Sequence, residues 1–148
     1  MGEPMKNARW KQRFQNYRRA FGLLREALED REVGAYSALE QEGVIQRFEY
    51  TFELGWKTLK DYLEYSGVQL AEATARSVIK ECAALGIFKQ AGINGETYLE
   101  MMLARNALSH TYDFERLADI IAKMKSNYFP ELLKEHDFFL EKEASEND

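Results

Sequence analysis

Residues 10–28, WKQRFQNYRRAFGLLREAL, contain the pattern that decides the fold class. Their large apolar residues are separated by four, three, four, three and four positions, which places them along one stripe of an α-helix. This spacing is typical of a helix that packs against other helices, and it predicts a helix over residues 8–29. The stripe consists of Trp10, Phe14, Tyr17, Phe21, Leu24 and Leu28.

A second amphipathic helix is predicted over residues 37–65. Ser37 and Glu40 have the spacing of a capping box, in which each side chain accepts a hydrogen bond from a free backbone amide of the first turn. Gly55 lies in the middle of this helix, where glycine costs roughly 1 kcal/mol relative to alanine. Its presence there indicates that another helix approaches closely.

The remaining pattern is also helical, since no segment alternates with the period of two that a half-buried strand requires. The predicted fold class is therefore all-α, an antiparallel up-and-down bundle of about four to six helices. We expect one domain over residues 8–142, a flexible N-terminus over 1–7 and an acidic flexible tail over 143–148. The further predicted helices cover residues 74–85, ending at Gly86, and residues 96–110, 113–128 and 130–142, the last beginning at Pro130.

The composition limits the functional classes. The 148 residues contain no apolar run near the ~18 residues of a membrane span, and residues 1–7 form no apolar signal-peptide core, so a cytoplasmic location without a membrane partner is expected. The single Cys82 stands in an apolar helical context and is interpreted as core packing. No metal site or cofactor is predicted.

The two ends of the chain carry opposite charge, although the net charge is −5. Residues 5–25 contain seven basic residues and no acidic one, whereas residues 131–148 contain seven acidic residues. One interpretation is that the two ends face each other or are simply solvated. The alternative is that the first helix binds the phosphate groups of RNA. The residues that would then contact RNA are Arg9, Arg13, Arg18 and Arg19.

Residues 105–112, RNALSHTY, hold the polar groups most suited to chemistry. If Tyr98, Leu99, Met102 and Leu103 set the apolar face of the fourth helix, then Asn106, Ser109 and His110 continue that face. Arg105 and His110 are about 140° apart around an ideal helix, so one straight helix does not aim both at one phosphate. Either the helix ends near His110 or a second copy supplies the missing group.

Arg105-Asn106 followed by His110 resembles the signature of HEPN proteins, and His110-Thr111-Tyr112 completes the longer form found in HEPN toxins. Those toxins are paired with a minimal nucleotidyltransferase (MNT). Residues 52–63 resemble the second helix of the nucleotidyltransferase substrate-binding branch of this family, and the resemblance extends over about residues 10–140.

The resemblance implies a metal-independent endoribonuclease. His110, with an ordinary pKa of about 6.5, would take the proton of a ribose 2′-hydroxyl, Arg105 would hold the phosphate and Asn106 would orient either group. One chain supplies only one such motif, so a composite site at a homodimer interface is implied. The resemblance further implies that the partner nucleotidyltransferase transfers AMP to Tyr112 and thereby blocks RNA.

Several alternatives stay open. Tyr112 is also explained as an ordinary aromatic at a helix end, Trp10 and Trp56 as core residues rather than platforms for bases, and His136 as an exposed residue. For the whole protein, the alternatives to a toxin are a non-catalytic subunit that presents a substrate to the nucleotidyltransferase, and a helical scaffold. Whether the chain is an enzyme is therefore left open, but it has no glycine-rich phosphate loop of its own.

Overall fold

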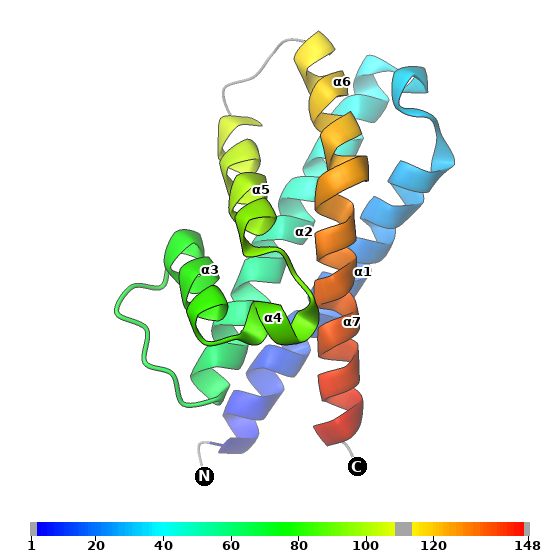
Figure 1. The fold of residues 1–148 in the computed structure, drawn as a ribbon. Helices are drawn as coiled ribbons and strands as arrows, with labels where there is room; N and C mark the ends of the chain where they lie inside the picture. The colour runs from blue at the N-terminus through cyan, green and yellow to red at the C-terminus, as the bar shows by residue number, and fades with distance from the viewer. Residues whose placement is uncertain (1–2, 109–113, 147–148) are drawn as a thin grey trace.

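The computed structural model describes residues 3–108 and 114–146, and within them the fold is the predicted all-α bundle. Two long helices, α1 and α2, pack side by side, and the continuous helix formed by α6 and α7 lies along them (Figure 1). The short helices α3 and α4, together with α5, cover one side of this frame. The elements are α1 (Glu3–Asp30), the 3₁₀-helix η1 (Val33–Ala35), α2 (Ala38–Tyr65), α3 (Ala75–Ala84), α4 (Ile87–Ala91), α5 (Gly95–Leu108), α6 (Phe114–Lys123), the π-helix η2 (Met124–Tyr128) and α7 (Phe129–Glu146).

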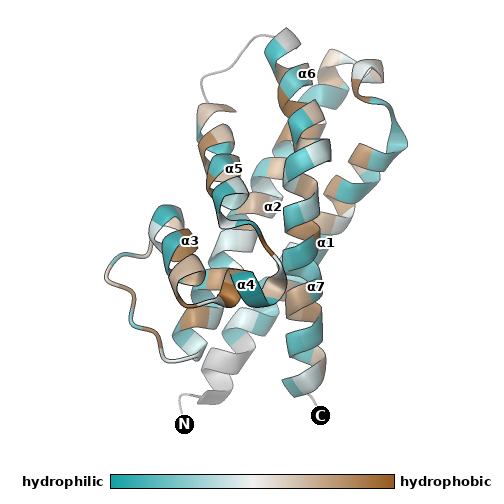
Figure 2. Ribbon diagram, viewed as in Figure 1, coloured by the Kyte–Doolittle hydropathy of each residue, from teal (hydrophilic) through white to brown (hydrophobic). Residues whose placement is uncertain are grey.

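The apolar stripe of α1 forms the centre of the core, as predicted. Trp10, Phe14, Tyr17 and Leu24 are fully buried, and hydrophobic and hydrophilic residues alternate around the long helices (Figure 2). Trp56 is also buried, so both tryptophans are core residues. His136 differs from the prediction: it is partly buried and its ring stacks on Phe21 at 4.8 Å between centroids.

The predicted capping box at the start of α2 is present. The Glu40 backbone N–H donates to the Ser37 hydroxyl at 3.2 Å, and the Ser37 backbone N–H donates to the Glu40 carboxylate at 2.9 Å. Two amides that have no partner within the helix are thereby satisfied. Gly86 adopts the left-handed conformation expected after α3, with φ of 80°, and a further short helix, α4, follows it directly.

The predicted helix boundary at Pro130 is wrong. Helical backbone continues without a break from α6 through η2 into α7. Proline removes an amide donor and its ring collides with the carbonyl four residues earlier in a regular α-helix. The π-helix immediately before Pro130 changes this local pairing: the Phe129 N–H donates to the Met124 carbonyl, five residues back. The wider turn lets the helix pass the proline.

Gly55 lies where side chains of three other helices approach α2 closely, as its position in the sequence indicated. A Cβ atom there would be 3.1 Å from each of Tyr17 Cε1, Tyr98 OH and Glu135 Oε1. These three side chains come from α1, α5 and α7, and all are fully buried. The Tyr98 hydroxyl donates to Glu135 Oε1 at 2.5 Å, and the Tyr17 hydroxyl donates to the Leu132 carbonyl at 2.6 Å. A small polar cluster at the centre of the core therefore depends on the absence of a side chain at Gly55.

The basic start of α1 and the acidic end of α7 lie against each other, as the first of the two charge interpretations predicted. Lys11 pairs with Glu146 at 3.8 Å, and the Gln15 amide donates to Glu143 at 2.8 Å. Both ends of the described chain lie at the same end of the bundle (Figure 1). Part of the positive charge of α1 is therefore used within the fold.

Candidate functional site at the end of α5

Arg105 lies on the side of α5 that faces the core. Tyr98, Met101 and Met102 are buried on this helix, and Arg105 follows Met101 and Met102 at the four- and three-residue spacing that keeps residues on one face. The predicted apolar face was partly wrong, because Leu103 is 49% exposed and Asn106 is exposed. Helix α5 has apolar residues on most of its circumference, so packing against α2 and α3, rather than the pattern of α5 itself, selects the buried side.

The Arg105 side chain is held against α2. Its Nη2 donates to Glu53 Oε2 at 2.5 Å, and the guanidinium lies 5.8 Å from the centroid of the Phe52 ring. Its Nη1 donates to the Asn106 amide oxygen at 3.4 Å. An arginine that is fixed by a carboxylate and an aromatic ring keeps its remaining N–H donors in a defined direction. The orienting role predicted for Asn106 stays a prediction.

Glu53 is the residue that the sequence analysis missed. Besides Arg105, the Glu53 carboxylate accepts hydrogen bonds from Trp56 Nε1 and from Lys57 Nζ, each at 3.1 Å. Burial alone would raise the pKa of Glu53, but the bonds from Trp56 and Lys57 and the charge of Arg105 outweigh it and lower that pKa. The three-residue and four-residue spacing to Trp56 and Lys57 was visible in the sequence. The contact with Arg105 could not be seen in the sequence, because Glu53 and Arg105 lie on different helices and are 52 residues apart.

Replacing Glu53 with glutamine tests how much the contacts of its carboxylate stabilise the fold. We expect Glu53→Gln to lower the free energy of unfolding by about 1 kcal/mol at pH 7, since two partly exposed ion pairs are lost. Because the folded-state pKa is lowered, this stabilisation is present above the ordinary value of 4.5 and is lost as the pH falls through the folded-state value. Urea unfolding at pH 7 measures the loss of stability, and urea unfolding at pH 3 shows whether that loss disappears in acid. Glu49→Gln, one turn earlier on α2, is the control; an equal effect of both substitutions at pH 7 contradicts the assignment.

His110 and Tyr112 lie outside the described residues, as do Ser109 and Thr111. Leu108, the last described residue of α5, is buried and comes directly before them. The roles assigned to His110 and Tyr112 therefore stay predictions. Arg105 and Asn106 are the two residues of the motif whose geometry is described.

The basic residues proposed as RNA contacts are not equivalent. Arg13 pairs at 3.0 Å with Asp61, which is almost completely buried, and the more exposed Arg9 pairs with Glu64 at 3.6 Å. Arg18 lies 5.9 Å from the Phe14 ring, and Arg19 donates to Asn16 at 3.3 Å. The charges of Arg9 and Arg13 are thus balanced by carboxylates of α2, whereas Arg18 and Arg19 are exposed and form no ion pair with a described acidic residue.

Two further features concern the described part of the chain only. Within residues 3–108 and 114–146, no group of three or more histidine, cysteine, aspartate or glutamate side chains is arranged to hold a metal ion. None of the described helices has the length and apolarity needed to cross a membrane.

The fold and the site define the class of the protein as a helical bundle in which an arginine, fixed by the second long helix, lies near the end of α5. The profile of one known family, described as nucleotidyltransferase substrate binding protein like, matches residues 12–141. The chain belongs to this family. A comparison with curated proteins gave no significant match. The family match spans α2 with Glu53 and α5 with Arg105, so both halves of the described site lie inside it.

Proposed function

We propose that this chain is a HEPN-type partner of a minimal nucleotidyltransferase and acts as a metal-independent endoribonuclease toxin. The observation that carries the proposal is the position of Arg105, which is fixed by Glu53 and Phe52 three residues before the end of the described α5. The family description supports the partnership with a nucleotidyltransferase. The ribonuclease activity rests on the motif formed by Arg105, Asn106 and His110.

In the proposed reaction, His110 removes the proton of a ribose 2′-hydroxyl, and the oxygen attacks the neighbouring phosphorus. A bond forms between this oxygen and phosphorus while the bond to the leaving 5′-oxygen breaks, which gives a 2′,3′-cyclic phosphate. The His110 of a second protomer donates a proton to the leaving oxygen. Arg105 stabilises the negative charge that builds on the phosphate oxygens, as a fixed, permanently charged donor can. A homodimer is required because one chain supplies one motif histidine.

AMP transfer to Tyr112 by the partner is the proposed means of silencing. Tyr112 is seven residues beyond Arg105 in the sequence. An attached AMP adds a negative phosphate and considerable bulk, which would compete with RNA for the Arg105 guanidinium.

Cleavage of RNA by the purified chain in excess EDTA tests this function. We expect the parent to release 2′,3′-cyclic phosphate ends, and we expect His110→Ala and Arg105→Ala each to reduce the rate at least about 100-fold. Arg116→Ala, which removes an exposed arginine of α6, is the control and should keep the parental rate. The dimer is checked by light scattering on the same samples.

A non-catalytic subunit that presents a substrate to the nucleotidyltransferase is the second candidate, and it is favoured by the wording of the family description. Absence of cleavage by a folded, unmodified dimer would contradict the toxin and support this alternative. Binding of the chain to its partner nucleotidyltransferase is expected for both candidate functions, the toxin and the non-catalytic subunit.

A further inference from the structure

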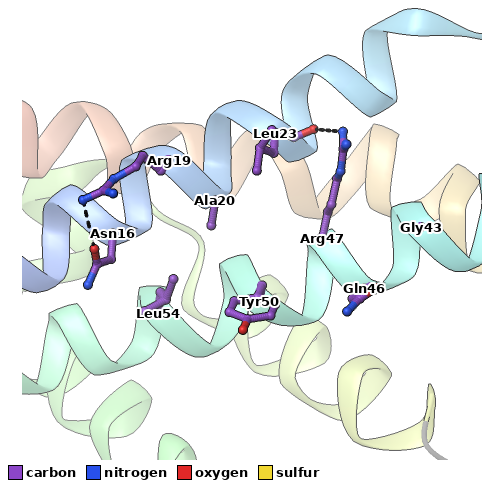
Figure 3. A pocket seen from close by; sticks show the side chains of 9 residues that line it. All are labelled: Asn16, Arg19, Ala20, Leu23, Gly43, Gln46, Arg47, Tyr50 and Leu54. Carbon is purple, nitrogen blue, oxygen red and sulfur yellow. Dashed lines mark hydrogen bonds between the residues drawn. The ribbon is translucent and has the colours of Figure 1, made fainter.

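Exposed apolar side chains gather on the α1–α2 face, which is formed by the outward stripes of residues 16–30 of α1 and 39–54 of α2. Leu23 and Tyr50, which are 48% and 63% exposed, line a groove of about 620 Å³ between the two helices (Figure 3). Leu39, 78% exposed, lies on the same stripe of α2, since positions 39, 43, 50 and 54 keep helical spacing. Three of the six large apolar side chains that are exposed in the described chain thus share one face, which indicates an interaction surface.

The two ends of the α1–α2 face carry opposite charge. The basic end is the groove with Leu23 and Tyr50, whose lining contains Arg19 and Arg47 and no acidic residue. The acidic end is an adjoining groove of about 330 Å³, which shares Gly43 and Arg47 with the first groove. Its acidic lining residues are Glu26, Asp30 and Glu40. Along α1, the charge of the lining residues therefore changes from positive before Leu23 to negative after it.

One charge at each end is not balanced within the described part of the chain. Arg19 is exposed, donates to the Asn16 side chain at 3.3 Å and forms no ion pair with a described carboxylate. Glu26 is exposed and forms no ion pair with a described basic residue. The neighbouring Asp30 and Glu40 differ, because both pair with Arg31. Arg19 and Glu26 are therefore the charges of this face that a bound protein would meet first.

We propose that the α1–α2 face binds the same face of a second copy of this chain, with a twofold axis near Leu23. Leu23 lies midway between Asn16 and Asp30, the outermost residues of α1 that line the two grooves. A half turn about this point lays the basic groove of each copy over the acidic groove of the other, as an isologous contact requires. The chain itself thus carries both halves of the complementary pattern.

The positions along α1 fit this arrangement. Arg19 lies four residues before Leu23, or about 6 Å along the helix axis, and Glu26 lies three residues after it, or about 5 Å. The half turn therefore brings Arg19 of one copy opposite Glu26 of the other, and it does so twice. It also covers Leu23 and Tyr50 of both copies, whose apolar surface is otherwise in water.

This contact differs from the homodimer of the proposed ribonuclease, which joins two motifs at the end of α5. Two different twofold contacts on one chain close into a tetramer, and each contact forms or is lost separately. The proposal therefore does not rest on the ribonuclease function. Loss of RNA cleavage with this association intact would contradict only the ribonuclease.

Charge reversal tests the contact, with sedimentation velocity of the full-length chain between about 1 and 200 µM as the measurement. We expect the parent to associate, and Arg19→Glu and Glu26→Arg each to weaken that association at least ~10-fold, because like charges then face each other. The variant with both changes has opposite charges facing again and should associate like the parent. Arg76→Glu, the control, makes the same charge change at an exposed residue of α3 and should also match the parent. A parent that stays monomeric, or a double variant no better than the single ones, overturns the proposal.

A pair of leucines tests the apolar part of the contact. Leu23 and Leu85 are both 48% exposed, but only Leu23 lies on the α1–α2 face. We expect Leu23→Ser to weaken the association at least ~10-fold and Leu85→Ser to leave it unchanged. Equal association by both variants overturns the location. If Arg19→Glu and Leu23→Ser keep the parental association but no longer bind the partner nucleotidyltransferase, the second copy is the wrong occupant and the face belongs to the partner protein.

Discussion

Replacing Gly55 with valine is expected to lower the free energy of unfolding by about 3 kcal/mol, and replacing it with alanine by about 1 kcal/mol. A Cβ would lie 3.1 Å from atoms of Tyr17, Tyr98 and Glu135, all fully buried side chains of three different helices. Alanine regains about 1 kcal/mol of helix propensity, which offsets part of the overpacking. Valine places two further carbon atoms in the same space and recovers less propensity. Urea unfolding followed by circular dichroism measures both variants.

The control for this prediction is Gly43→Ala in the same helix. No atom lies within 4 Å of a Cβ at Gly43, so only the helix propensity changes and the protein should gain up to about 1 kcal/mol. The two alanine substitutions are therefore expected to have opposite signs. If Gly55→Ala stabilises the protein as much as Gly43→Ala does, the close approach of the four helices at Gly55 is wrong. The alanine variant keeps the test measurable if the valine variant does not fold.

Local sequence signals predicted the long helices well. The stripe from Trp10 to Leu28, the capping box at Ser37 and the close approach at Gly55 are each contained within one helix, where spacing fixes which residues share a face. The opposite charges at the two ends of the chain also predicted their contact, since Lys11 lies against Glu146. These features needed no knowledge of the bundle's geometry.

Features that depend on more than one helix were predicted poorly. The buried side of α5 is chosen by its neighbours, so the sequence placed Leu103 inside and did not place Arg105 on the core side. Glu53 was assigned no role from the sequence, whereas it binds Arg105 across the bundle. Pro130 was interpreted as a helix start because the π-helix before it has no clear sequence signature. His110, the predicted base of the catalytic motif, lies outside the described residues.

The buried Glu135 at the centre of the core is expected to make stability depend strongly on pH. Burial, only partly opposed by the hydrogen bond from Tyr98, raises the pKa of Glu135 from 4.5 to about 8. The folded state therefore keeps a proton that the unfolded chain loses above about pH 5. Stability from this group is fully present below the unfolded value of 4.5 and is lost as the pH rises towards 8, by about 1.4 kcal/mol per pH unit.

The groups around Glu135 do not share this titration. Tyr17 of α1 and Tyr98 of α5 have pKa values raised well above 10 by burial, with the negative charge of Glu135 as the next contribution. Burial likewise raises the pKa of the Cys82 thiol of α3 above its usual value of 9. All three stay neutral between pH 5 and 8. Asp137 of α7 acts on Tyr17 from an exposed position, and Gly55 of α2 contributes no charge. Glu135 is therefore the group in this cluster that titrates in the window.

The comparison of the parent with Glu135→Gln isolates the effect. Glutamine has nearly the same shape, its amide oxygen can accept the Tyr98 hydroxyl, and it does not ionise. The difference in unfolding free energy, variant minus parent, should rise by about 1.4 kcal/mol for each pH unit between 5 and 8, whatever its value at pH 5. Denaturant midpoints at closely spaced pH values measure this slope, and the other titrating groups cancel in the difference. Parallel curves for the two proteins would mean that Glu135 ionises in the folded state as readily as in water. The buried cluster around Gly55 would then have to contain a compensating positive charge or admit water.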